Sequence, residues 1–127
     1  VSAMLTEMKL VDEALGHYYL GWHAMNNKDF EVAAAHYRRA LELDPELFRA
    51  KNGLAVNMAH AGEMEQAIAT AEELTEARPD YAPPYYNLAW WHAVEKGNPD
   101  AARPFYNKAL ELGMPKEKKI EKAFGEE

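Results

Sequence analysis

The chain has 127 residues, 48% of them hydrophobic, no cysteine, and a formal net charge of −7 at neutral pH. The missing cysteines exclude disulfide bonds and thiolate metal sites. No apolar run reaches the roughly 20 residues of a membrane-spanning helix. The negative charge argues against non-specific binding to nucleic acid, because that binding depends on neutralising phosphates.

The first predicted element is an N-terminal helix. Apolar residues recur there at steps of three and four, which places their side chains on one helical face; they are Leu5, Met8, Val11, Leu15, Tyr18, Trp22 and Met25. The pattern favours one continuous helix from about Ser2 to Asn26, and the alternative is a separate short helix that ends near Leu10. In either case Leu5, Met8 and Val11 require burial against this chain, a second copy or a neighbouring domain.

A period of 34 residues runs through the rest of the chain. It relates Leu20-Gly21, Leu54-Ala55 and Leu88-Ala89, and it also relates Ala33 to Ala67 and Pro45 to Pro79. A fixed period of this size is the signature of a repeat architecture. Each repeat is one supersecondary unit that buries its apolar face by stacking on its neighbours.

Each unit is expected to hold two helices joined by a turn. Gly21, Ala55 and Ala89 are small enough to let the helices approach closely, and the preceding residues Leu20, Leu54 and Leu88 are expected to pack in the core. Asn, Gly and Asp mark the turns at 26–29, 60–63 and 96–100. The segment 95–100 is predicted to form a turn one residue longer than its counterparts.

The last predicted element is a short helix at 115–125 that covers the end of the repeats. Pro115 suits the first turn of a helix. Ile120, Ala123 and Phe124 then fall on one face. Lysines alternate with glutamates along this segment (Lys116, Glu117, Lys118, Lys119, Glu121, Lys122), which predicts a solvated face with local ion pairs.

The motif within the first unit has a known counterpart. It reads Ala14-Leu15-Gly16-His17-Tyr18-Tyr19-Leu20-Gly21, then Lys28-Asp29-Phe30, then Ala33, Tyr37 and Ala40-Leu41-Glu42-Leu43-Asp44-Pro45. This motif resembles the tetratricopeptide repeat, although His17 and Lys51 stand where that family favours Trp. The resemblance covers about Asp12 to Pro115.

The resemblance implies an all-α fold, a right-handed α-solenoid of antiparallel helix pairs. It implies a single domain over 1–127, with a helical extension at about 1–12, repeats at 13–46, 47–80 and 81–114, and a capping helix at 115–125.

The resemblance also implies where a partner binds, because the first helix of each repeat lines a concave face in that family. The residues carried over are Tyr18, Trp22, Met25, Arg49, Asn52, Val56, His60, Tyr86, Asn87 and Trp90. Trp22 and Trp90 share one repeat position, with the smaller Val56 between them. Trp and Tyr anchor protein interfaces through large rigid area plus one polar handle. The alternative is that Trp22 and Trp90 only pack within the protein.

Catalytic and metal-binding patterns are missing from the sequence. The five histidines lack the four-residue spacing that places two ligands on one helical face, and the glycines form no phosphate-binding loop. We therefore expect no enzyme activity, no metal and no cofactor.

The predicted function is a scaffold or adaptor that binds a peptide or short helix with apolar anchor residues. One alternative is a structural or oligomerisation module that dimerises through the N-terminal helix. Another is a regulatory segment of a larger protein. No signal peptide is recognisable, and a soluble, cytoplasmic location is favoured, although the compartment stays open.

Overall fold

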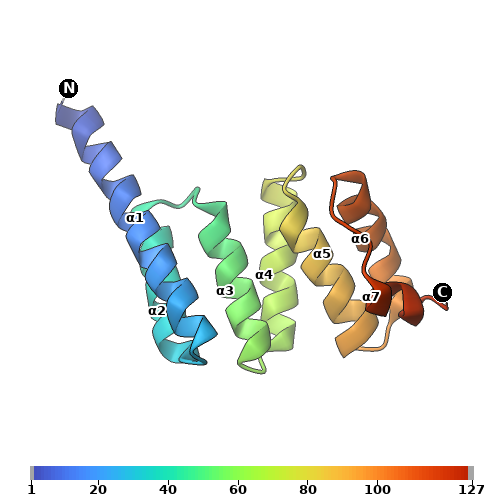
Figure 1. Cartoon of the computed structure of the whole chain (residues 1–127). Coiled ribbons are helices and arrows are strands. Elements are labelled where there is room, and N and C mark those ends of the chain that lie inside the picture. Colours follow the sequence, from blue (N-terminus) through green and yellow to red (C-terminus); the bar gives the residue numbers. More distant parts are fainter. Residues whose placement is uncertain (1, 126–127) are drawn as a thin grey trace. The chain divides into compact units, whose positions relative to one another are not determined.

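The structure is a computed structural model that describes residues 2–125, and these residues form helices and no strand (Figure 1). The all-α prediction is confirmed. The elements are α1 (Ser2–Asn26), α2 (Phe30–Leu43), α3 (Phe48–His60), α4 (Met64–Ala77), α5 (Ala82–Trp90), the π-helix η1 (Trp91–Glu95), α6 (Pro99–Glu111) and α7 (Lys118–Ala123). They fall into two compact units, unit 1 (Val1–Ala67) and unit 2 (Ile68–Glu127), and α4 crosses the boundary.

Helix α1 is continuous, the longer of the two alternatives for the N-terminus. It contacts α2 and α3 in unit 1. Its first part extends past the end of α2 (Figure 1), and every residue from 6 to 13 is exposed. Ala14 is the first fully buried position of the described side chains. The side chain of Leu5 lies outside the described part of the chain.

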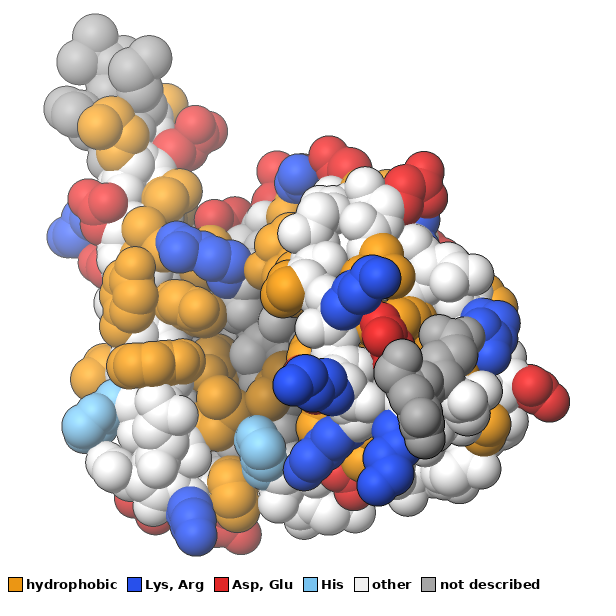
Figure 2. Space-filling view, turned by 45° about the vertical axis from the view of Figure 1, so that its right-hand side comes forward, with side chains coloured by type: hydrophobic (Ala, Val, Ile, Leu, Met, Phe, Trp, Pro, Cys, Tyr) orange, Lys and Arg blue, Asp and Glu red, His pale blue; other side chains and the backbone are white. Residues whose placement is uncertain are grey.

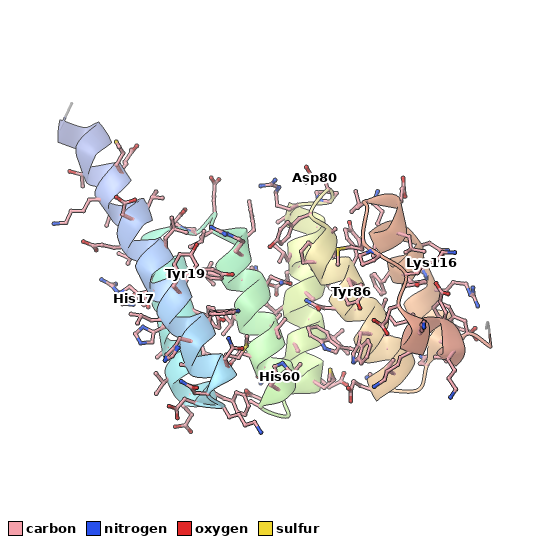
Figure 3. The ribbon with its side chains drawn as sticks, in the orientation of Figure 1. His17, Tyr19, His60, Asp80, Tyr86 and Lys116 are labelled. Carbon is pink, nitrogen blue, oxygen red and sulfur yellow. The ribbon has the colours of Figure 1, made fainter. Side chains whose placement is uncertain are left out.

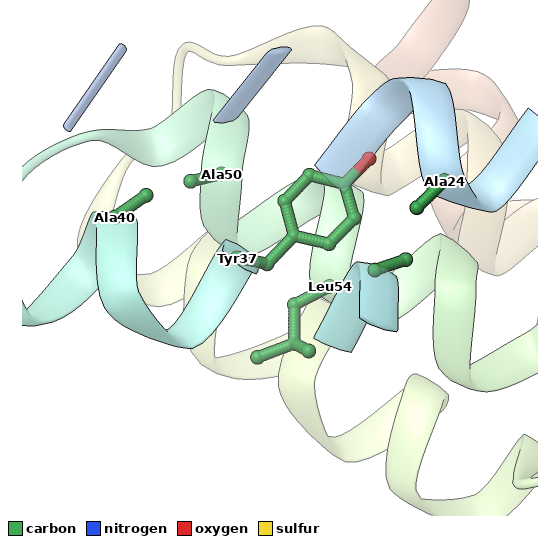
Figure 4. Packing of buried hydrophobic residues seen from close by; sticks show 6 residues of the cluster. Ala24, Tyr37, Ala40, Ala50 and Leu54 are labelled. Carbon is green, nitrogen blue, oxygen red and sulfur yellow. The ribbon is translucent and has the colours of Figure 1, made fainter. Parts of the chain in front are cut away.

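The core of unit 1 forms around the ring of Tyr37, which is fully buried among small residues of three helices (Figure 4). Four alanines and one leucine complete the cluster: Ala24 from α1, Ala33 and Ala40 from α2, and Ala50 and Leu54 from α3. A methyl group added at Gly21 would lie 3.0 Å from the ring of Tyr37. The close helix approach predicted at Gly21 is therefore confirmed.

The repeated leucines differ in burial. Leu54 and Leu88 are buried as predicted, but the prediction for Leu20 is wrong, since 51% of this residue is exposed. Leu54 on α3 belongs to the cluster formed with α2, the helix that precedes α3. The described residues hold no helix before α1 that could cover Leu20 in the same way.

In unit 2 the extra residue of the third repeat lies in a helix and not in the following turn. It is taken up by the π-helix η1, whose wider turn accommodates one more residue. Lys96 N donates to Trp91 O at 2.9 Å, and Asn98 N donates to His92 O at 2.7 Å, a bond that spans six residues. The matching bond in the first repeat, from Asp29 N to Ala24 O, spans five.

The C-terminal helix is shorter than the segment 115–125 predicted from the sequence. Helix α7 begins at Lys118 and its N-cap is Glu117, whose carboxylate accepts from Lys119 N at 3.2 Å. Pro115 therefore lies before the helix, not in its first turn. The predicted apolar face is present, because Ile120 is fully buried with Ala123 and Phe124 packed on the same cluster.

Candidate functional site

The predicted groove residues form two sets, one in each unit. Unit 1 holds Tyr18, Trp22 and Met25 on α1 and Arg49, Asn52, Val56 and His60 on α3; unit 2 holds Tyr86, Asn87 and Trp90 on α5. The resemblance implied positions on the first helix of each pair, and all of these residues lie on those helices.

The side chain of Tyr18 lies at the boundary between the core of unit 1 and its surface. Its ring is half-buried and lies 6.0 Å from the ring of Tyr37. The guanidinium of Arg49 lies 5.3 Å from the centre of the Tyr18 ring, within the range of a cation–π contact. Two predicted site residues from different helices are thus in contact.

Trp22 is the most exposed of the predicted aromatic residues in unit 1. Half of it, 52%, is accessible, and it is not part of the buried cluster around Tyr37. Its neighbour Tyr19 is exposed as well, on a different side of α1 from His17 (Figure 3). Hydrophobic side chains gather along α1 in Figure 2. The side chain of Trp22 is therefore accessible on unit 1.

Met25 and His60 converge on one hollow of about 230 Å³ at the turn ends of α1 and α3. Phe30 and Lys28 also line this hollow. The ring of His60 stacks on the ring of Phe30, with the planes 15° apart. The two other predicted residues of α3, Asn52 and Val56, are half-buried.

In unit 2 the aromatic residues of α5 are held by polar partners. The hydroxyl of Tyr86 donates to Glu117 Oε2 at 3.1 Å. Burial and this bond to the carboxylate raise the pKa of Tyr86 above its usual value. Trp90 Nε1 donates to Glu95 Oε1 at 3.3 Å, and Lys119 Nζ lies 5.7 Å from the Trp90 ring. Asn87, which follows Tyr86 in the sequence, is also half-buried.

Sequence reasoning missed the part that the C-terminal segment plays here. Glu117 and Glu121 were expected to pair with the lysines around them, but both accept hydrogen bonds from tyrosine hydroxyls, those of Tyr86 and Tyr106. Lys119 is placed over Trp90 by the same arrangement. The alternation of Glu and Lys was a sequence signal for this arrangement. When one face of the C-terminal segment packs on unit 2, the glutamates turn toward the protein and the lysines turn toward solvent.

A second hollow in unit 1, of about 420 Å³, contains none of the predicted residues. It lies between α2 and α3 and is lined by Phe30, Glu31, Ala34, Arg38, Asn57, Met58, Ala61 and Glu63. Asn57 is almost fully buried, and its Nδ2 donates to Phe30 O at 2.9 Å. This bond fixes the orientation of the amide and ties the first turn of α2 to α3.

The described residues contain no group of three or more His, Asp or Glu side chains arranged for a metal ion. His17 Nδ1 and His36 Nδ1 lie 3.0 Å apart with stacked rings, a hydrogen-bonded pair that joins α1 to α2. No helix in this part of the chain is long and apolar enough to cross a membrane.

The chain matches the family model of the tetratricopeptide repeat over residues 18–82 and again over 61–117. It therefore belongs to the tetratricopeptide repeat family, which confirms the resemblance and the solenoid-type fold class. Repeats of this family generally mediate protein–protein interactions, and the family is typically a non-enzymatic scaffold. Comparison with the curated proteins found no match.

Proposed function

We propose that this chain is an adaptor that binds a peptide or short helix through the aromatic positions of the first helix of each pair. The observation that carries the proposal is the half-exposed Trp22 on α1. Tryptophan side chains are highly buried on average. A large apolar side chain that stays accessible in a protein-binding family is a natural anchor point for a partner.

The surroundings of Trp22 in unit 1 define the kind of ligand. Tyr18 offers a ring already in contact with Arg49, and the hollow with Met25 and His60 accepts a small apolar side chain. The side-chain amide of Asn52 matches the donors and acceptors of a peptide backbone. These groups suit a segment with one or two apolar anchors between polar residues.

Unit 2 carries a separate and more polar set of its own. Trp90 is half-buried between Glu95 and Lys119, and the hydroxyl of Tyr86 is already bonded to Glu117. We expect the more exposed Trp22 to supply most of the affinity for a ligand bound to unit 1. An interface with so few anchors is typically micromolar, about −8 kcal/mol.

The test is a titration with peptides selected from a displayed random library on the intact chain. Trp22→Ala is expected to weaken binding at least about tenfold, the effect of losing one aromatic hot spot. Leu20→Ala is the matched control, because Leu20 is equally exposed on another face of α1. Undiminished binding in a variant that carries both Trp22→Ala and Trp90→Ala would rule out both aromatic positions as binding sites.

A further inference from the structure

The N-terminal part of α1 carries an apolar face that the described chain leaves exposed at Met8 and Val11. Met8 is 57% exposed and Val11 is 42% exposed, and the half-buried Leu15 follows at the same helical spacing. Steps of three and four residues place all three on one side of the helix. We call Met8, Val11 and Leu15 the N-terminal stripe. The stripe lies on the helical turns of α1 that precede Tyr18 and Trp22. The role proposed for it does not depend on the proposed peptide site.

A helix in this situation lacks the usual source of helical stability. Most helices in proteins are stabilised by packing of an apolar face, because short isolated helices are marginal in water. The residues from 6 to 13 are all exposed, so none of the described residues supplies that packing. The stripe is therefore the part of α1 that gains most from a partner.

Two carboxylates frame the stripe. Successive residues are about 100° apart around a helix, so Glu7 lies at one edge of the stripe and Asp12 at the other. These two residues form an open hollow together with Met8 and Val11. The only cation between residues 6 and 13 is Lys9, which lies off the stripe. A ligand of this surface meets an apolar floor between two negative edges.

We propose that the N-terminal stripe docks an amphipathic helix of a partner protein, with apolar residues at three- and four-residue spacing flanked by Lys or Arg. A helix laid along a helix presents apolar anchors at the spacing that the stripe offers. Basic flanks pair with Glu7 and Asp12. A second copy of this chain would instead bring its own Glu7 and Asp12 against the same edges, and like charges that close repel each other.

The test uses two synthetic probes of about 20 residues, one amphipathic helix of Leu and Lys and a matched helix of Leu and Glu. Fluorescence anisotropy with the intact chain is expected to show binding of the Leu–Lys helix alone. Met8→Ala with Val11→Ala is expected to weaken it about tenfold or more, since two anchors are lost. Alanine keeps the helix intact, which circular dichroism verifies.

Matched controls separate this surface from general attraction to an acidic protein. Leu10 is also exposed, but it lies about 100° or more from Met8 and Val11 around α1. Leu10→Ala is therefore expected to leave affinity unchanged. Glu7→Gln with Asp12→Asn is expected to weaken binding several-fold and to reduce its salt dependence. Glu13→Gln, on the far side of the helix, changes affinity little.

Four outcomes overturn the proposal. They are an absence of Leu–Lys binding, equal binding of the Leu–Glu helix, an equal loss in the Leu10→Ala or Glu13→Gln variant, and a dimer. The dimer is sought by sedimentation of the intact chain; if Met8→Ala with Val11→Ala dissociates it, the occupant of the stripe is a second copy.

Discussion

The ring of Tyr37 on α2 lies so close to Gly53 on α3 that the position has no room for a side chain. A Cβ atom at Gly53 would be 2.6 Å from Cε1 of Tyr37 and 2.8 Å from Cζ. On its other side the same ring meets Gly21 of α1. One aromatic ring therefore sets the spacing of all three helices of unit 1.

Gly53→Ala is expected to cost about 1–3 kcal/mol through overpacking, because the ring of Tyr37 or helix α3 must move. Alanine offsets up to about 1 kcal/mol of this cost in a helix interior, so a net destabilisation of up to about 2 kcal/mol is expected. Urea unfolding measures the difference. In a Tyr37→Leu background the cost of Gly53→Ala is expected to shrink, as a double-mutant cycle would show.

Gly16 is the matched control for Gly53. It also lies in a helix, but a Cβ added there meets nothing within 4 Å. Gly16→Ala is expected to stabilise the protein by about 0.5–1 kcal/mol. A similar loss of stability in both variants would contradict the role assigned to Tyr37.

The turns of the first two repeats differ at one strained position. Lys28 and Gly62 are 34 residues apart, and both have positive φ, 65° and 88°. The left-handed conformation costs a residue with a side chain about 1–2 kcal/mol. Lys28→Gly is expected to raise the free energy of unfolding by up to about 1 kcal/mol, and Gly62→Ala to lower it by about 1–2 kcal/mol. Thermal unfolding tests both, with Lys28→Ala as a control that gives no gain.

Alkaline pH is expected to destabilise the protein through two buried tyrosines. Burial raises the pKa of Tyr37 and Tyr106 from 10.0 to about 12, with Tyr18 adding to the shift at Tyr37 and Glu121 to that at Tyr106. The raised values favour the neutral phenol in the folded state. The contribution of these two tyrosines to the free energy of unfolding should stay constant below pH 10 and be lost between pH 10 and about 12.

Denaturant unfolding across this pH range measures the fall. Tyr37→Phe should remove the contribution of Tyr37, so a fall as steep as in the parent chain would contradict the assignment. At neutral pH the variant is expected to be as stable as the parent chain or more so, because Tyr37 Oη has no hydrogen-bond partner among the described residues.

The attachment of α7 depends on Tyr106. Its hydroxyl donates to Glu121 and accepts from Glu117 N at 2.9 Å. Tyr106→Phe is expected to cost about 1–2 kcal/mol and to speed amide exchange in α7 while that in α1 to α3 is unchanged. Tyr85→Phe is the control, because the Tyr85 hydroxyl donates to the carbonyl of Pro79 at an exposed site. Unchanged exchange in the Tyr106→Phe variant would show that the apolar contacts of Ile120 suffice.

Much of the fold and part of the site followed from residue spacing. The 34-residue period identified the helix pairs, the close approach at Gly21 and the burial of Leu54 and Leu88, because each depends on contacts that recur in every repeat. The positions of Tyr18, Trp22 and Trp90 on first helices followed in the same way. Leu20 departed from the pattern, since Leu54 packs in the cluster formed with α2 and the described residues hold no helix before α1.

Contacts between residues far apart in the chain had no such signal. The spacing marked Trp90 as a candidate anchor, but it did not indicate that Lys119 and Glu95 would hold it. Nor did it show that Tyr37 fills the space left by Gly53, or that a π-helical turn absorbs the extra residue of the third repeat. Local pattern fixes which residues share a helical face. The partner of each face depends on side-chain volumes and hydrogen bonds that become defined only when the helices pack.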